Sequence, residues 1–261
     1  MRISGEEAEA FEVVSGRLDA GLLILCDHAE ATMPPEFAGL GLPQSERERH
    51  IASDIGAKTV SLTLAKAFDC PAVLSRFSRL LIDPNRGLDD PTLVMQLADG
   101  AIIPGNLRIS EAGVAARIAR FYQPYDDAIT RTIASMKQAG PNPVIIAMHS
   151  FTPRMKGVER PWHITVIWDA DPRLNRRLLD ALAREPDLVV GENEPYQGGY
   201  EGDTIERHAI RGGLAHALIE IRQDLIATED AAQAWGLRLA GILRPLLAEP
   251  ALHDIRHFGK A

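Results

Sequence analysis

In the stretch PVIIAMHS, residues 143–150, an apolar run rich in β-branched residues is followed by His149 and Ser150. Short runs of this kind, bounded by turn residues, are typical of buried β-strands. Five other runs share the composition: GLLILC at 21–26, PAVLS at 71–75, HITVIW at 163–168, LVVG at 188–191 and HALIEI at 216–221. Longer amphipathic segments separate most of them. The alternation predicts an α/β fold, a mostly parallel mixed sheet with helices on both faces.

Four segments between and after these runs have helical apolar spacing. Ser45 and Glu48 have the spacing of a capping box, and the apolar pattern after them predicts one long helix ending at Phe68. The other segments are 110–139, which Pro124 must kink or split, 173–184 and 229–248. Because no repeat, low-complexity stretch or linker interrupts the pattern, we expect a single domain over 1–261.

The composition excludes several classes of function. A formal net charge of -8 offers no broad basic surface for nucleic acid or anionic lipid. We therefore expect neither a nucleic-acid nor a membrane partner. The first residues lack the basic and apolar regions of a secretory signal, and the two cysteines are too few for a disulfide framework. These features predict a cytoplasmic protein; the oligomeric state is not predicted.

Two histidines follow predicted strands and are candidate metal ligands. His28 comes after the run at 21–26 and His149 after the run at 143–148. Ligands of open α/β sheets bind at the carboxyl ends of strands, so the two imidazoles can converge on one ion. His50 and Asp54, spaced i, i+4 on the predicted first helix, are the alternatives for a third ligand. Asp54 is favoured because it lies where the pattern turns apolar.

The segment 75–91, SRFSRLLIDPNRGLDDP, predicts a clamp for an anion. Arg76, Arg79 and Arg86 carry permanent charge and can form bidentate hydrogen bonds to a carboxylate or steady an oxyanion. Asn85 stands beside Arg86 and is expected to contact the same substrate. The alternative is a self-satisfied turn in which Asp83 pairs with Arg86.

The glycine-rich loop 194–208 and the run at 216–221 supply the remaining candidates. Tyr200 and Thr204 in the loop are predicted to bind substrate under a mobile lid, the alternative being an ordinary surface loop. Glu220 interrupts an apolar strand, where burial raises a carboxyl pKa towards the range of a general base. A structural ion pair with Arg222 or another buried arginine is the alternative for Glu220.

The order of these motifs resembles the N-formylglutamate amidohydrolase family. The resemblance rests on Asp27-His28, the 78–86 stretch, His149-Ser150, 198–200 and Leu218-Ile219-Glu220, and it covers the chain from about Leu22 to Leu225. It implies a phosphorylase/hydrolase-like fold related to zinc carboxypeptidases. It also implies a divalent metal ion, with zinc expected, and the hydrolysis of N-formylglutamate to formate and glutamate.

The match departs from the family pattern at both histidines. Cys26-Asp27-His28-Ala29-Glu30 stands where the family tends to have Ser-Pro-His-Ser-Gly, and Ala147 stands where an Asp is usual. The chain thus resembles a divergent member that hydrolyses an N-acyl acidic amino acid, a small anionic substrate. Competing functions are a non-catalytic binding domain, a zinc carboxypeptidase-like peptidase, and a serine hydrolase using Ser150, although no Gly-x-Ser-x-Gly elbow surrounds that serine.

Overall fold

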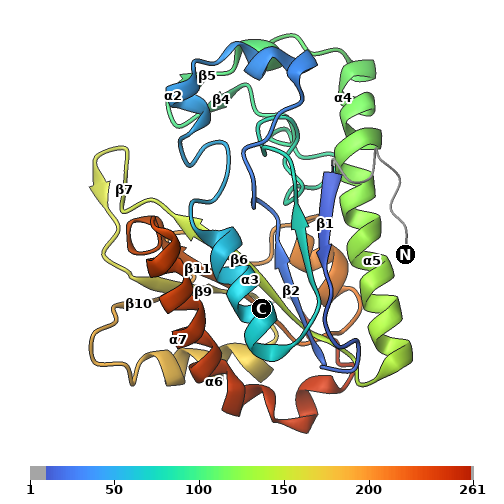
Figure 1. Cartoon of the computed structure of the whole chain (residues 1–261), viewed down its shortest axis with the longest axis vertical. Helices are drawn as coiled ribbons and strands as arrows, with labels where there is room; N and C mark the ends of the chain where they lie inside the picture. The colour runs from blue at the N-terminus through green and yellow to red at the C-terminus, as the bar shows by residue number, and fades with distance from the viewer. Residues whose placement is uncertain (1–9, 260–261) are drawn as a thin grey trace.

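The computed structural model describes residues 10–259 and is built on a seven-stranded sheet in the order β1-β3-β2-β6-β11-β9-β10 (Figure 1). Its strands are β1 (Phe11–Val14), β2 (Leu22–Cys26), β3 (Ala72–Ser75), β6 (Val144–Phe151), β9 (Ile164–Ile167), β10 (Val190–Glu192) and β11 (His216–Arg222). β3, β2, β6 and β11 run parallel, as do β9 and β10, whereas β1 and the β9–β11 pair are antiparallel. The predicted mostly parallel mixed sheet is confirmed, and β1 is a strand that the prediction missed.

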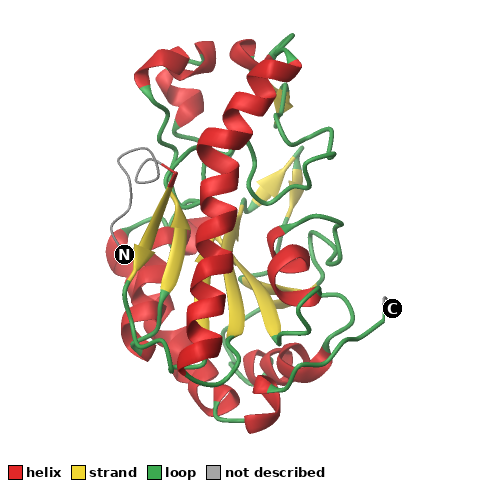
Figure 2. Cartoon of the chain, turned by 90° about the vertical axis from the view of Figure 1, so that its right-hand side faces the viewer, coloured by secondary structure: helices red, strands yellow, loops and turns green. Residues whose placement is uncertain are grey.

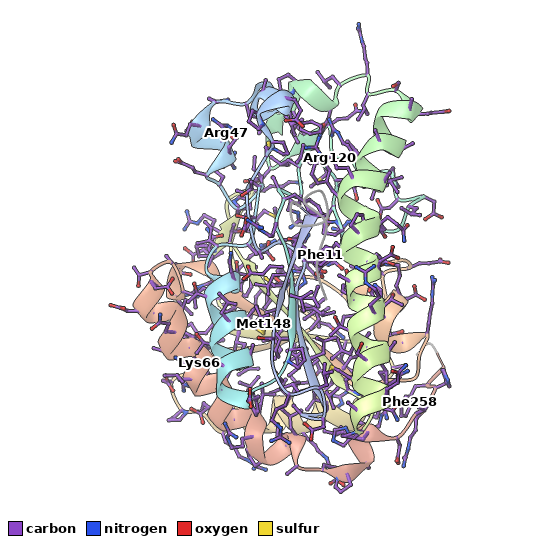
Figure 3. The ribbon with its side chains drawn as sticks, turned by 45° about the vertical axis from the view of Figure 1, so that its right-hand side comes forward. Phe11, Arg47, Lys66, Arg120, Met148 and Phe258 are labelled. Atoms are coloured by element: carbon purple, nitrogen blue, oxygen red, sulfur yellow. The ribbon has the colours of Figure 1, made fainter. Side chains whose placement is uncertain are left out.

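Helices cover both faces of the sheet, as predicted (Figures 1 and 2). They are α2 (Gln44–Arg47), α3 (Ala57–Phe68), α4 (Glu111–Arg117), α5 (Gln123–Ala139), α6 (Pro172–Leu182) and α7 (Glu229–Leu247). The long α5 covers one face, and α3, α6 and α7 cover the other. The strands serve two cores because side chains alternate between faces. In Figure 3, Phe11 belongs to the core under α5 and Met148 to the core under α3 and α7.

The single long helix predicted over 45–68 is wrong. α2 stops at Arg47, turns follow, and α3 begins only at Ala57. Gly56 precedes α3 with φ +79°, and a Cβ there would lie 2.1 Å from the carbonyl oxygen of Ile226. The left-handed conformation and this close approach both require glycine, which breaks the apolar periodicity that suggested one helix. His50 and Asp54 therefore do not share a helix face.

The helical segment predicted over 110–139 is confirmed with a local change of hydrogen bonding. Ser110 caps α4 by accepting a hydrogen bond from the Gly113 amide. A π-helical turn, η3 (Ile118–Tyr122), then leads into α5, so Pro124 lies in the first turn of α5. The helix accommodates Pro124 because the hydrogen bonding changes to a π-helical turn just before it, where the Gln123 amide donates to the Ile118 carbonyl.

Short elements complete the described part of the chain. They are η1 (Pro35–Gly41), the hairpin β4 (Leu97–Ala98) and β5 (Ala101–Ile102), η2 (Pro104–Asn106), the hairpin β7 (Arg154–Met155) and β8 (Val158–Glu159), η4 (Glu206–Ile210), η5 (Gln223–Leu225) and η6 (Pro250–His253). In Figure 1, α2, β4 and β5 lie above the sheet. Over residues 10–259, no helix has the length and apolar character needed to cross a membrane.

Candidate metal centre and active site

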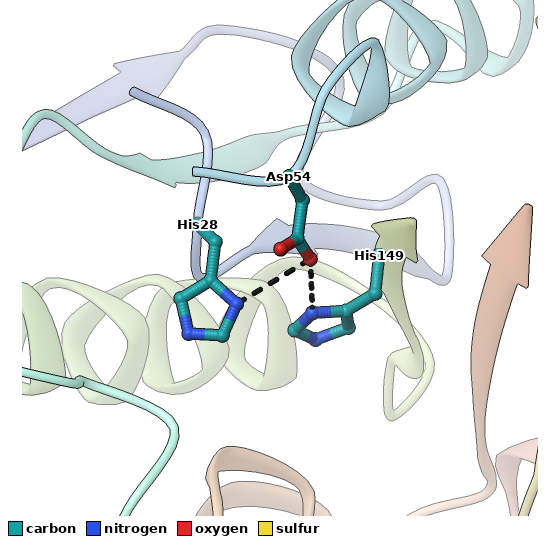
Figure 4. Close-up of side chains that lie close together, drawn as sticks. All are labelled: His28, Asp54 and His149. Carbon is teal, nitrogen blue, oxygen red and sulfur yellow. Dashed lines mark hydrogen bonds and ion pairs between the residues drawn. The ribbon is translucent and has the colours of Figure 1, made fainter. Parts of the chain in front are cut away.

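Three residues predicted as metal ligands come together at the carboxyl ends of β2 and β6. Figure 4 shows His28 and His149 both directed toward Asp54. Oδ2 of Asp54 lies 2.9 Å from Nδ1 of His149 and 3.4 Å from Nδ1 of His28. One ligand atom from each residue lies within 4.8 Å of the others, and all three side chains are buried. Two imidazoles and one carboxylate form a donor set that suits zinc with a position left open.

Asp54 reaches this position from a loop, and not from the predicted helix. Its backbone amide donates a hydrogen bond to the carbonyl of His28 at 2.9 Å, which joins the loop before α3 to the end of β2. His149 differs from the prediction too, because β6 continues through it to Phe151. The three candidate ligands thus come from a turn after β2, a loop before α3 and the strand β6.

Two further carboxylates face the distal nitrogens of the histidines. Oδ1 of Asp83 lies 2.7 Å from Nε2 of His28, and Oδ2 of Asp27 lies 3.3 Å from Nε2 of His149. A carboxylate that accepts the Nε2 proton leaves Nδ1 free to ligate an ion and makes the ring a stronger donor. This arrangement fits a divalent ion at the three Nδ1 and Oδ2 atoms.

The outer carboxylates are fixed by groups from distant parts of the chain. Asp27 accepts hydrogen bonds from Tyr125 Oη at 2.8 Å and Thr204 Oγ1 at 2.9 Å. Asp83 accepts hydrogen bonds from the Arg79 guanidinium at 2.7 Å and from the backbone amide of Asn85 at 2.9 Å. Neither carboxylate can turn away from its histidine without losing these bonds.

Charge in this buried cluster shifts the titration of its members. Burial alone raises the pKa of Asp54, but the charges and hydrogen bonds of His28 and His149 outweigh it and hold the pKa below its usual range. Burial lowers the pKa of His149, yet hydrogen bonds and charges from Asp27 and Asp54 raise it to about 10. The cluster therefore stabilises positive charge where the imidazoles meet, as a cation site requires.

Glu220 lies beside the candidate metal ligands and forms no ion pair with another residue that the structure describes. It is the register partner of His149 on the parallel strands β11 and β6. Burial raises the pKa of Glu220 to about 7. No hydrogen bond or ion pair joins its carboxyl to another residue of the described range, and Arg222 pairs with Asp224 at 2.8 Å instead. The structural pairing of Glu220 with Arg222 is thus not found.

A cavity of about 160 Å³ opens over these groups. Five residues predicted to bind or transform substrate line it: Arg79, Asn85, Arg86, Tyr200 and Glu220. Residues that the sequence reasoning did not single out line it too, notably Tyr196, Gln197 and Asp203. Burial raises the pKa of Asp203 to about 6. Only the position of these three in the 194–208 loop pointed towards them.

Arg76, Thr204 and His50 do not line the cavity. Arg76 is exposed and borders a separate hollow near Phe77, because the chain turns between Arg76 and Arg79. Thr204 is fully buried, and its hydroxyl serves Asp27 while its amide donates to Asn85 Oδ1 at 3.0 Å. His50 lies 3.4 Å from Asp99. The expected contacts of Arg76 and Thr204 with substrate are therefore not supported by their placement.

The two arginines in the cavity have different surroundings. Arg79 is held by Asp83, with Nη1 3.5 Å from Asp54. Arg86 does not pair with Asp83; its Nε donates to Thr92 and its Nη1 to the Asn85 carbonyl. No hydrogen bond from Nη2 of Arg86 joins another described residue. Arg86 thus keeps a charged donor for a ligand in the cavity.

Ser150 is poorly placed to act as a nucleophile. Its Oγ atom is buried and has no hydrogen-bond partner among the described residues. Both nitrogens of the adjacent His149 face carboxylates, Asp54 and Asp27. A serine hydrolase needs a histidine that accepts the serine proton, and His149 is engaged elsewhere.

Comparison with known proteins agrees with this geometry. The family model described as N-formylglutamate amidohydrolase matches residues 20–227, which is most of the chain. The chain belongs to the N-formylglutamate amidohydrolase family. No curated protein matches the sequence significantly. The family assignment confirms the resemblance seen in the motifs from Asp27 to Glu220.

Solved structures of this family's fold are similar along nearly the whole chain. A gene product from Agrobacterium tumefaciens is 34% identical, with a TM-score of 0.87, covering 94% of this chain and 98% of that one. An N-formylglutamate amidohydrolase from Ralstonia eutropha is 20% identical, with a TM-score of 0.67, covering 91% and 99%. At that identity the second likeness shows a shared fold.

Proposed function

We propose that the protein is a metal-dependent amidohydrolase that cleaves an N-acyl acidic amino acid, such as N-formylglutamate, to formate and glutamate. The observation that carries the proposal is the buried His28, Asp54 and His149 set, with Glu220 in register beside it and arginines across the cavity. Family membership supports hydrolysis, and the presence of Arg79 and Arg86 in the cavity lining supports an acidic substrate.

His28, Asp54 and His149 would hold the ion, for which we propose zinc. A divalent ion bound there supplies Lewis acidity, lowering the pKa of a coordinated water and polarising the scissile carbonyl. Asp27 and Asp83 keep the two imidazoles in the orientation that presents Nδ1. The protein groups fix the ligand geometry before substrate arrives, so little reorganisation is needed during the reaction.

Glu220 acts as the proton carrier. Its carboxyl is buried, lines the cavity, and has a pKa raised to about 7, so both protonation states are accessible near neutral pH. The ionised carboxylate accepts a proton from water as the water attacks the amide carbonyl. The resulting acid then donates this proton to the leaving nitrogen, which lets the amine depart without carrying negative charge.

The arginines bind and stabilise anionic groups of the substrate. Arg86, with a donor directed to no other described residue, steadies the oxyanion that forms at the amide carbonyl. Arg79 contributes positive charge for a substrate carboxylate, and Asn85 and Tyr200 line the same cavity. Specificity for acidic N-acyl amino acids follows because a neutral side chain forms no charge-assisted hydrogen bonds with these arginines.

Release of formate from N-formyl-L-glutamate tests the proposal. Zinc-loaded protein should release formate from it faster than from N-formyl-L-leucine, and N-acetyl-L-glutamate and a dipeptide ending in glutamate complete the panel. Cleavage of the peptide alone would support a carboxypeptidase-like enzyme. Hydrolysis of none of these amides by protein that retains zinc would overturn the amidohydrolase and leave a metal-binding domain.

A further inference from the structure

A second cavity, of about 60 Å³, lies on the sheet beside the candidate active site. None of its lining residues borders the first cavity. The side chains of Leu218 and Ile167, paired across β11 and β9, border the active-site cavity. His216 stands two residues before Leu218, Asp169 stands two residues after Ile167, and both line the second cavity. β11 and the chain that follows β9 thus both run between the active-site cavity and the second cavity.

His216 lines this cavity and has a buried ring nitrogen whose acceptor capacity is unsatisfied. Its side chain is buried, and Nδ1 lies 3.0 Å from the carbonyl oxygen of Leu214. A carbonyl can only accept, so Nδ1 carries the proton and Nε2 presents a lone pair. Burial lowers the pKa of His216, which keeps the ring neutral. Nε2 has no hydrogen-bond partner within residues 10–259.

Asp169 supplies a second acceptor and a negative charge. The other charged residues around the cavity are engaged: Asp171 pairs with Arg173 at 2.6 Å, Glu206 with Arg211 at 2.7 Å, and Arg256 with Asp254 at 2.7 Å. No hydrogen bond or ion pair within the described range involves the Asp169 carboxylate. Asp169 is half-buried, and a carboxylate in such a position favours a cation that donates hydrogen bonds.

The remaining walls are apolar and partly formed by the end of the described chain. Ile210 and Leu214 line one part of the cavity, and Phe258 lines another. Figure 3 shows Phe258 at the lower right, on the C-terminal segment. The amide of Arg256 donates to the Gly213 carbonyl at 2.9 Å and holds this segment over the cavity. A ligand there needs a charged donor end and a small apolar body.

We propose that this cavity binds a small primary ammonium compound, whose N–H groups donate to Nε2 of His216 and to the carboxylate of Asp169. A quaternary ammonium ion of equal charge has no N–H group and cannot satisfy Nε2. A neutral alcohol can donate to His216 but gains no ion pair with Asp169. A comparison of these ligands therefore distinguishes binding at this cavity from the general attraction of cations to an acidic protein.

Titration of zinc-loaded protein with ethylammonium chloride tests the proposal. Long-range proton–nitrogen NMR spectra resolve imidazole nitrogens, and the His216→Phe variant assigns the Nε2 signal of His216. Ethylammonium should shift that signal in a saturable manner, whereas tetramethylammonium should not. Signals of His28 and His149 report separately on cations that enter the candidate active site.

Two charge-neutralising variants make the comparison specific. Asp169→Asn should weaken ethylammonium binding by about tenfold or more, because it removes the charge and one charge-assisted hydrogen bond. Asp180→Asn, an exposed position on α6, makes the same change of net charge and should leave binding unaltered. Thermal unfolding confirms that each variant is folded. Equal weakening in both variants, a response to tetramethylammonium at His216, or no saturable shift would overturn the site.

Discussion

His149 and Glu220 are direct register partners on the neighbouring parallel strands β6 and β11. Side chains of paired residues on adjacent strands lie on the same face of a sheet, so the carboxyl of Glu220 stands beside a candidate metal ligand. Two residues earlier the same strands hold Ala147 and Leu218, which pack into the core under α5. Along both strands, the side chains on this face thus change from apolar core residues to polar site residues at the same pair, His149 and Glu220.

Removal of one imidazole should abolish stoichiometric metal binding. We expect His149→Ala, and separately His28→Ala, to lose the ion, because two remaining ligands cannot hold zinc in a tetrahedral site. Elemental analysis of protein purified without metal stripping provides the measurement. His50→Ala is the matched control, since His50 contacts Asp99 outside the cavity and should leave metal content unchanged. Equal metal content in all four proteins would contradict the ligand assignment.

Replacement of Glu220 by glutamine should stop turnover and spare the fold. Glu220→Gln keeps the side-chain shape but cannot accept the water proton, so kcat should fall by about a hundredfold or more. Because the carboxyl has no described cationic partner, the amide leaves no buried charge unpaired and the melting temperature should not decrease.

Thermal unfolding, metal content and turnover measured on one preparation separate the two roles of Glu220. A variant that is destabilised by about 3 to 5 kcal/mol and still turns over at the wild-type rate would show a buried ion pair instead. Loss of activity together with loss of zinc would place Glu220 among the groups that retain the ion. Either result rejects the general-base assignment.

Lysine should not replace the arginines of the cavity. Arg86→Lys retains the charge but loses the planar fork, so kcat/KM for an acidic N-acyl amino acid should fall about tenfold or more. Arg79→Lys should lower kcat/KM too and also lower stability, because Arg79 holds Asp83. Arg76→Lys is the control: Arg76 is exposed outside the cavity, and its substitution should have little effect. If Arg86→Lys behaves like Arg76→Lys, Arg86 does not contact the reacting amide.

The sequence predicts the strands, and the convergence of His28 and His149, because their signals are local. Apolar runs mark β2, β6 and β11, and His28 and His149 stand where two of these runs stop. The turn to an apolar pattern favours Asp54 over His50, but Asp54 reaches the site from a loop whose amide donates to the His28 carbonyl, and not from a helix. A charged residue in apolar surroundings is thus a correct signal for Asp54, whereas the helix predicted to carry it is wrong.

The remaining parts of the site depend on contacts that no local pattern carries. Asp27 is fixed by Tyr125 and Thr204, which lie 98 and 177 residues away in the sequence. The sequence predicts that Thr204 contacts substrate, but its hydroxyl donates a hydrogen bond to Asp27. The three arginines are close in sequence, yet turns direct Arg76 and Arg79 to different hollows. In turn-rich segments residue spacing does not determine side-chain direction.

Metal binding should release one proton from His149. In the metal-free protein the pKa of His149 is raised to about 10, so the ring is charged at about pH 8, and ligation through Nδ1 must displace a proton. Apparent zinc affinity should therefore rise with pH, about tenfold per unit, until the pH approaches that pKa. The ordinary value is 6.5, so the stabilisation from this raised pKa is complete below pH 6.5 and is lost as the pH rises through about 10.

Calorimetric titration with zinc at about pH 8, in two buffers of different ionisation enthalpy, counts the protons released. Glu220, with a pKa of about 7, is already mostly ionised at this pH, so the Glu220→Gln variant should release the same number as the wild type. His149→Ala should show neither the proton nor the affinity. Zinc binding without proton release in the wild type would mean that Asp27 and Asp54 do not hold His149 in its charged form.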